Sequence, residues 1–342
     1  MLAFVIVAIL LAFVFTYTNG FQIASSVGAS FIASRSALPR QGILFIAAMM
    51  VLGALLGGSA VAFTISGLLL MEPSDQLVLV VLAALIGATG SNLLTWKFAL
   101  PSSSTHALIG GLIGAGLAAA GHESIAWGLR DLLVAPHELT GLVKVLVFLI
   151  LSVVIGLIGG YALHRWVKFL LRNAKRSVND SLVNLNWIAA GIMAFASGAN
   201  ASQKQLGIIA LVIFAAGFSA APGIPFSARL VCALMLGLGT LTGGWRIMTT
   251  LGRKLFRLEP IHSFNSQLSS GVSIALSTFL GAPVSPTQVI SLSLIGVGSA
   301  ENPRKIQWSV GKDIVASFLI IIPATMIVSG VIYLVIGAWT GR

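Results

Sequence analysis

The chain has 342 residues, of which 57% are hydrophobic and 8% are charged. A soluble globular domain carries roughly 25% charged residues, so this composition excludes an ordinary water-soluble protein. Apolar stretches of the length needed to cross a bilayer, about 20 helical residues, recur along the chain. They are continuous rather than alternating, which argues against a β-barrel. The sequence predicts an all-α, multi-pass protein of the cell membrane, in contact with membrane lipid.

The apolar segments follow one another closely, and several are too short to span a bilayer. The short ones are flanked by Gly, Pro, Ser and Asn, which is typical of the broken or re-entrant helical hairpins that form transporter binding sites. We expect about 10–12 membrane segments. In chain order they are 2–18, 21–34, 42–70, 77–99, 103–120, 142–171, 183–200, 204–221, 227–251, 268–282, 287–300 and 312–339.

The formal net charge of +11 comes largely from Lys and Arg gathered in short connecting segments. The positive-inside rule places such segments in the cytoplasm, so we expect no nucleic-acid partner. The loop that holds Glu72 and Asp75 has no Lys or Arg and is expected outside. The three basic segments are 164–176, Arg253 to Arg257, and Arg304 to Lys312.

The two halves of the chain carry the same polar pattern. The segment "PSSSTHALIGGLIGAG" begins at Pro101, and "PVSPTQVISLSLIGVG" begins 182 residues later, at Pro283. A weaker pair is "NGFQIASS", from Asn19, and "GANASQK", from Gly198. The repeat predicts duplicated transmembrane units over 1–163 and 183–342, joined by a basic cytoplasmic loop at 164–182. An odd number of crossings in each half would make the units inverted.

The paired polar motifs predict an anion-binding site. Each proline-led motif begins a short helix, whose unpaired N–H groups and positive dipole end attract an anion. Polar side chains in the apolar segments must face protein or a water-filled cavity, and Lys204 is a candidate charge partner for the anion. Helix capping, Ser/Thr packing between helices and a Lys204 that reaches the interface are the alternatives without a ligand. The candidate substrate-binding residues are Gln22, Ser25, Ser102, Ser103, Ser104, Thr105, Asn200, Ser202, Gln203, Lys204, Ser285 and Thr287.

In order and spacing, five segments resemble the inorganic phosphate transporter (PiT) family over nearly the whole chain. They are "NGFQIASS", "NLLTWKFALPSSSTHALIGGLIGAG", "GANASQKQLGIIAL", "LGTLTGGWRIMTTLG" and "APVSPTQVISLSLIGVG". The resemblance implies a duplicated core in which an oxyanion and a cation bind between the repeats. The family's signature Asp, implicated in cation coupling, falls at Ile23 and Ala201, and its second-half His falls at Gln288. Hard-cation sites usually recruit a carboxylate, so we expect neither sodium coupling, nor a metal site, nor a cofactor.

The missing carboxylates favour sulfate over phosphate in this interpretation. Phosphate near neutral pH keeps a proton that it can donate to a carboxylate, whereas sulfate only accepts hydrogen bonds and suits a site made of donors. This resembles the sulfate-permease branch of the family, which implies proton symport. His106, whose imidazole titrates near neutrality, is the candidate proton-coupling residue. A neutral, hydrogen-bonded His106 is the alternative.

The sequence therefore predicts a secondary active transporter that imports sulfate with protons by alternating access, without enzyme activity. The main alternative is a sodium- or proton-coupled phosphate transporter. An intramembrane hydrolase with Ser103 or Ser104 as nucleophile and His106 as base has no local acid to orient the imidazole. The proline-led hairpins could also line the pore of an anion channel, but duplicated binding motifs fit alternating access better. A homodimer is left open.

Overall fold

The computed structural model describes residues 2–98, 100, 102–175, 177–243 and 258–340. These residues form helices and connecting loops, with no β-strand among them, as the sequence predicted. The first half contains α1 (Leu2–Ala33), α2 (Pro39–Leu56), α3 (Ala60–Ser66), α4 (Asp75–Lys97), α5 (Ser104–Ala120), η1 (His122–Ser124), α6 (Leu129–Leu133) and α7 (Gly141–Leu170). The second half contains α8 (Val178–Ala215), α9 (Phe226–Gly243), α11 (Pro260–Phe279), α12 (Pro286–Glu301), η2 (Pro303–Lys305) and α13 (Trp308–Thr340).

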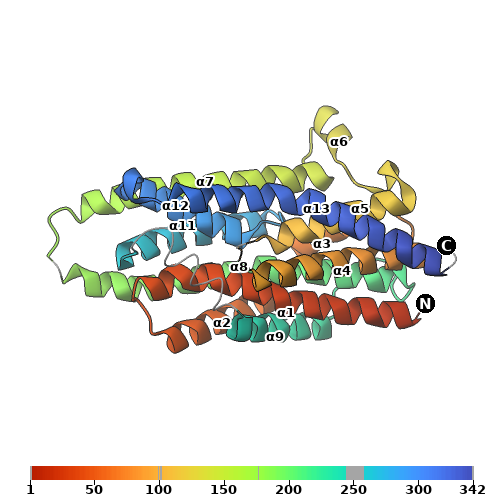
Figure 1. The fold of residues 1–342 in the computed structure, drawn as a ribbon, viewed down its shortest axis with the longest axis horizontal. Coiled ribbons are helices and arrows are strands. Elements are labelled where there is room, and N and C mark those ends of the chain that lie inside the picture. The colour runs from red at the N-terminus through yellow and green to blue at the C-terminus, as the bar shows by residue number, and fades with distance from the viewer. Residues whose placement is uncertain (1, 99, 101, 176, 244–257, 341–342) are drawn as a thin grey trace.

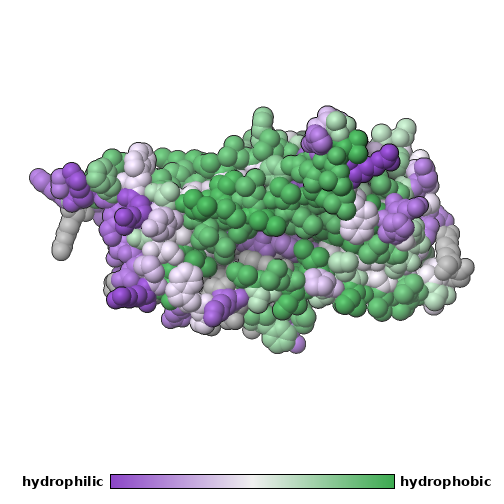
Figure 2. All heavy atoms as spheres, turned by 90° about the horizontal axis from the view of Figure 1, so that it is seen from above, coloured by the Kyte–Doolittle hydropathy of each residue, from purple (hydrophilic) through white to green (hydrophobic). Residues whose placement is uncertain are grey.

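Seven of the described helices are long and apolar enough to cross a membrane. They lie side by side along the long axis of the molecule (Figure 1). Hydrophobic side chains cover its length and hydrophilic ones gather at its two ends (Figure 2). An apolar belt between polar ends is the surface that a bilayer requires, so the chain is a multi-pass membrane protein.

The first and last helices place both chain ends at the same end of the molecule (Figure 1). The opposite end, here called the basic end, carries Arg35 after α1, Arg165 and Lys168 near the end of α7, and Arg304 after α12. The positive-inside rule predicts that the basic end faces the cytoplasm. The predicted basic group at Arg253 to Arg257 lies outside the described residues.

Two long helices differ from the predicted segments. The sequence predicted separate segments on either side of each mid-chain polar motif, but α1 and α8 run through the motifs at Asn19 and Asn200 without a break. The polar side chains are buried and bond to neighbouring helices, so the helices need not end there to satisfy them. The breaks occur instead at the proline-led motifs, between α4 and α5 and between α11 and α12.

The helices of the two halves correspond in order, α1 with α8, α2 with α9, α4 with α11, α5 with α12 and α7 with α13. Helices of one half pack on helices of the other half: α7 packs on α12, and α13 packs on α5. Likewise α1 packs on α9 and α2 packs on α8. Corresponding helices run in opposite directions, and α5 and α12 begin in the middle of the molecule and point to opposite ends (Figure 1). These directions are what inverted repeats predict.

Two glycines explain why the sequence repeat includes "LIG". A Cβ atom added at Gly114 on α5 would lie 2.0 Å from the backbone oxygen of Met326 on α13. A Cβ atom added at Gly296 on α12 would lie 2.1 Å from the backbone oxygen of Leu157 on α7. Both short helices therefore touch the backbone of a long helix from the other half, a contact that only glycine allows.

We predict that Gly114→Ala and Gly296→Ala each lower the free energy of unfolding by about 1–3 kcal/mol, because the methyl group overlaps a rigid backbone. The measurement is thermal unfolding in detergent. Gly90→Ala on α4 is the matched control, since a Cβ atom there meets nothing within 4 Å. Equal melting temperatures for all three variants would contradict the close packing.

Candidate functional site

The two proline-led motifs bring the starts of α5 and α12 together. Ser103 precedes α5, and its hydroxyl accepts the backbone N–H of His106 at 3.1 Å, so it caps this helix as the capping alternative expected. The ring of His106 also contacts the Ser103 hydroxyl. The side-chain nitrogen of Gln288 on α12 lies 3.1 Å from Nδ1 of the same ring. His106 is thus held between the two halves. Pro101, which begins the first motif, lies outside the described residues.

Lys204 on α8 is buried, with 2% of its surface exposed. Its ammonium donates to Thr105 Oγ1 at 2.7 Å, to the backbone oxygen of Val284 at 2.9 Å and to Asn200 Oδ1 at 3.2 Å. The Thr105 hydroxyl in turn donates to the same Val284 oxygen at 2.9 Å. Three acceptors match the three N–H groups of a charged lysine. One alternative was that Lys204 reaches the membrane interface. Its side chain instead joins α8 to both broken hairpins.

Asn200 holds the loop between α11 and α12 in place. Its Oδ1 accepts the backbone N–H of Val284 at 3.2 Å. Its Nδ2 donates to Thr278 Oγ1 at 2.9 Å and to the backbone oxygen of Ala282 at 3.1 Å. With Lys204 one helical turn further along α8, it fixes the backbone that leads to the start of α12.

The charge of Lys204 has no carboxylate partner among the described residues, where the ion pairs involve Glu301 instead. Burying a charge is costly unless it is paired and hydrogen-bonded. Hydrogen bonds are present here, but the positive charge itself is not neutralised. The meeting point of the two hairpins is therefore a place where an anion would be stabilised.

A second polar chain lies in the first half. Gln22 on α1 donates to Thr95 Oγ1 on α4 at 3.0 Å, and the Thr95 hydroxyl lies 2.8 Å from that of Ser102. Ser25 differs from these, since its hydroxyl donates to the Gln22 backbone oxygen of its own helix at 2.6 Å. Thr95 was not among the predicted site residues, although it lies in a segment that carries the family resemblance.

Ser202 and Gln203 are turned toward α2 and α3. Gln203 accepts the backbone N–H of Val61 at 2.8 Å and donates to the backbone oxygen of Gly57 at 2.5 Å. Ser202 lies 3.5 Å from the backbone oxygen of Ala54. Gln203 thus satisfies an N–H group in the first turn of α3, a requirement of every helix start. The remaining predicted residues, Ser104, Ser285 and Thr287, are buried at the starts of α5 and α12.

Several buried polar atoms near the middle of the bundle have no hydrogen-bond partner among the described residues. The acceptors are Gln22 Oε1, Asn92 Oδ1 and Gln205 Oε1, and the donors are Asn19 Nδ2 and Gln205 Nε2, with the Ser104 hydroxyl able to do both. Leaving such groups unpaired costs about 1–3 kcal/mol each. Such groups are candidates for contact with a polar ligand or with ordered water.

The comparisons with known proteins agree with one another. Residues 19–329 match the phosphate transporter family. The chain is 33% identical over 327 residues to a probable low-affinity inorganic phosphate transporter of Rhizobium meliloti, covering 95% of this chain and 94% of the relative. It is 30% identical over 340 residues to a protein of the same description from Bacillus subtilis, covering 98% of each.

A solved structure, described as the sodium-dependent phosphate transporter, shares the fold. It superimposes with a TM-score of 0.79 at 24% identity and covers 98% of this chain and 99% of its own. The residues that match the family, 19–329, include the motifs at Asn19, Thr105, Asn200 and Thr287. The chain belongs to the phosphate transporter family.

Proposed function

We propose that this protein is a secondary active transporter that imports inorganic phosphate by alternating access. The observation that carries the proposal is the buried Lys204 ammonium, which lies where the two broken hairpins meet and has no carboxylate partner among the described residues. Family membership and the phosphate named in the descriptions of the relatives support it. The prediction of sulfate finds no support in these comparisons.

The unpaired acceptors also favour phosphate. Sulfate only accepts hydrogen bonds, so it would leave Gln22 Oε1, Asn92 Oδ1 and Gln205 Oε1 unsatisfied. Monohydrogen phosphate brings one O–H donor, which can pair with one of these three acceptors, as well as acceptor oxygens. A site without carboxylates can still contain hydrogen-bond acceptors. Amide and backbone carbonyl oxygens accept hydrogen bonds and carry no net charge that would repel a dianion.

We propose protons rather than sodium as the coupling ion. A hydroxyl, an amide oxygen and a backbone carbonyl surround the Lys204 ammonium, and these neutral oxygens are the ligand types that hard cations bind. The tethered ammonium already fills this position, and a sodium ion there would be repelled. His106, between Ser103 and Gln288, remains the candidate proton carrier.

The hydrolase alternative is disfavoured by the same contacts. Ser103 and His106 do touch, as a nucleophile and base must. However, the side chain from α12 that contacts the imidazole is the amide of Gln288. An amide does not stabilise the imidazolium that forms when a serine is deprotonated.

Uptake into proteoliposomes tests the transport proposal directly. We expect saturable uptake of radiolabelled phosphate driven by an inward proton gradient, unchanged by a sodium gradient and not inhibited by excess sulfate. Faster uptake of sulfate than of phosphate would overturn the substrate assignment. Stimulation by sodium would overturn the assignment of the coupling ion.

Thr105→Val tests whether the Lys204 cluster binds the anion. Valine keeps the shape but removes the hydroxyl between Lys204 and Val284, and a hydrogen bond to a charged group contributes about 1.5–3 kcal/mol. We expect phosphate affinity to fall about tenfold to a hundredfold, measured by equilibrium binding. Thr16→Val on α1, whose hydroxyl donates to its own helix at Ala12, is the control and should bind as the wild type does.

Gln205→Met tests the role of the unpaired amide. Because neither polar atom of Gln205 has a partner among the described residues, we expect unchanged or higher thermal stability without phosphate, together with weaker phosphate binding. Gln203→Met is the comparison, since it removes two hydrogen bonds to the α2–α3 connection and should lower the melting temperature. Wild-type phosphate affinity in Gln205→Met would show that this amide does not face the ligand.

A further inference from the structure

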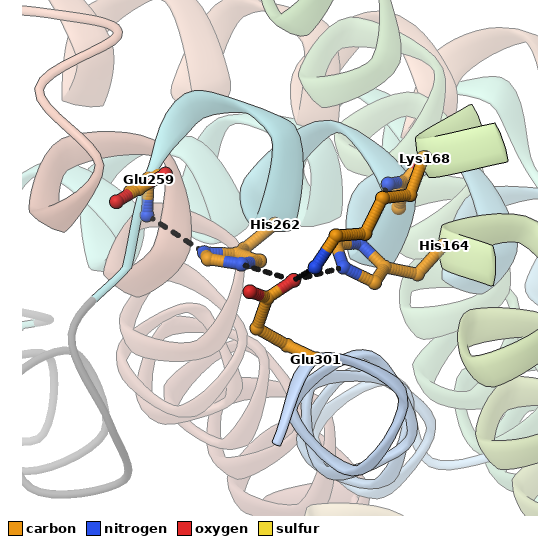
Figure 3. A network of polar contacts seen from close by, with 6 residues as sticks. His164, Lys168, Glu259, His262 and Glu301 are labelled. Carbon is orange, nitrogen blue, oxygen red and sulfur yellow. Dashed lines mark hydrogen bonds and ion pairs between the residues drawn. The ribbon is translucent and has the colours of Figure 1, made fainter. Parts of the chain in front are cut away.

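A second polar cluster lies at the basic end, where α7, α11 and α12 meet. His164 and Lys168 come from α7, His262 comes from the first turn of α11, and Glu301 is the last residue of α12. Lys168 and both histidines point toward Glu301 (Figure 3). Its Oε2 atom lies 2.7 Å from Lys168 Nζ, 2.9 Å from His164 Nε2 and 3.8 Å from His262 Nε2.

The hydrogen bonds on the far sides of the two rings fix where their protons lie. The backbone N–H of Glu259 donates to His262 Nδ1 at 3.0 Å, so a neutral His262 carries its proton on Nε2, toward Glu301. His164 Nδ1 lies 3.0 Å from the side-chain nitrogen of Asn265, and with this amide as the donor, His164 also carries its proton on Nε2. Three N–H groups are therefore directed at one carboxylate oxygen.

This arrangement does not suit a metal ion, although His164, His262 and Glu301 offer ligand atoms within 4.8 Å of one another. A metal ion needs the lone pair of each Nε2 atom, and the partners of the Nδ1 atoms assign a proton to both Nε2 atoms instead. The Lys168 ammonium would also repel a cation. What these three residues suit is an oxygen atom with negative charge.

The cluster is open to water on one side. His164 and His262 are buried, whereas the side chains of Glu301 and Lys168 are 33% and 54% exposed. An anion from the aqueous phase at the basic end can reach the position of the Glu301 carboxylate if that carboxylate moves away. Glu301 ends the helix whose first turn contains Gln288, and Gln288 contacts His106 in the central site. A movement of Glu301 is therefore linked to the central site through α12.

Buried polar atoms lie between the two sites. Ser266, Gln267 and Ser291 each have a side-chain oxygen without a partner among the described residues, and all three are at least 99% buried. They lie on α11 and α12, between the central motifs and the cluster at Glu301. A polar stretch inside an apolar bundle is expected along the route of an ion.

We propose that Lys168, His164 and His262 form a second oxyanion-binding site at the cytoplasmic end, which Glu301 fills with its own carboxylate until the transported anion displaces it. The identity of the anion rests on the proposed function, and the site itself rests on the geometry of the cluster. Displacement exchanges one oxyanion for another on the same three donors and frees the end of α12 from α7. Release of phosphate and movement of α12 are thereby linked.

Glu301→Ala tests the proposal in the full-length protein in detergent. The change removes the carboxylate that accepts from Lys168 and His164, so we expect a lower melting temperature in phosphate-free buffer and recovery as inorganic phosphate is added. Chloride at equal ionic strength should not restore it. At a phosphate concentration too low to displace Glu301 in the wild type, equilibrium binding with radiolabelled phosphate should find more phosphate bound per chain in Glu301→Ala than in the wild type. Glu138→Ala, which removes an exposed acid from the other end, is the control.

The added phosphate is assigned to the cluster by a second change. Lys168→Met in the Glu301→Ala background should abolish both the recovery and the additional phosphate. If Glu301→Ala does not fold, Glu301→Gln provides the same comparison, with a weaker acceptor in place. Equal binding of phosphate by the wild type and the Glu301 variants at that low concentration would overturn the second site. Failure of the wild type to take up phosphate would overturn the proposed function instead.

Discussion

The structure depends on the burial of one ammonium group in the middle of a membrane bundle. Lys204 cannot be hydrated there, so every N–H group must find an oxygen within the protein. One comes from Thr105 in the first broken hairpin, one from Val284 in the second, and one from Asn200 on the same helix. The position of each hairpin is therefore defined relative to α8. A charge that is costly to bury is what holds the two halves in register.

The broken hairpins and the continuous helices complement each other. A proline-led start leaves backbone N–H groups and a loop without regular hydrogen bonds, which lipid does not tolerate. Asn200 satisfies backbone groups of the loop before α12, and the Gln22–Thr95–Ser102 chain ties the Ser102 side chain before α5 to α4 and α1. In return, these contacts allow α1 and α8 to keep polar residues in mid-membrane without interruption. Neither arrangement would be stable in lipid without the other.

Much of this architecture could be predicted from the sequence, because it rests on local rules and on the repeat. The offset between Pro101 and Pro283 indicated the duplication, and Thr105, Asn200 and Lys204 do meet at its centre. The orientation of neighbouring side chains could not be predicted. Successive residues in a helix point about 100° apart, so which of Gln203 and Lys204 faces the hairpins depends on the position of α3. The cluster at Glu301 joins residues 137 positions apart, and no local pattern marks it. The preference for sulfate, which the comparisons do not support, has a related weakness, because the positions of backbone and amide acceptors are known only when the chain is folded.

The two charged clusters have opposite chemistry at opposite ends of one short helix. Near the start of α12, a cation is surrounded by three acceptors, and at its end an anion faces three donors. In the central cluster the Lys204 ammonium occupies a position that would suit a mobile cation. In the other cluster the Glu301 carboxylate occupies a position that would suit a mobile anion. In this structure the protein's own side chains provide hydrogen-bond partners for both of these charges. Under the proposed second site, the tethered Glu301 carboxylate sets a minimum affinity that a transported anion must exceed to displace it. Displacement would free the end of α12 from α7, and the close backbone contact of Gly296 with α7 is the surface along which α12 would then move as a rigid unit.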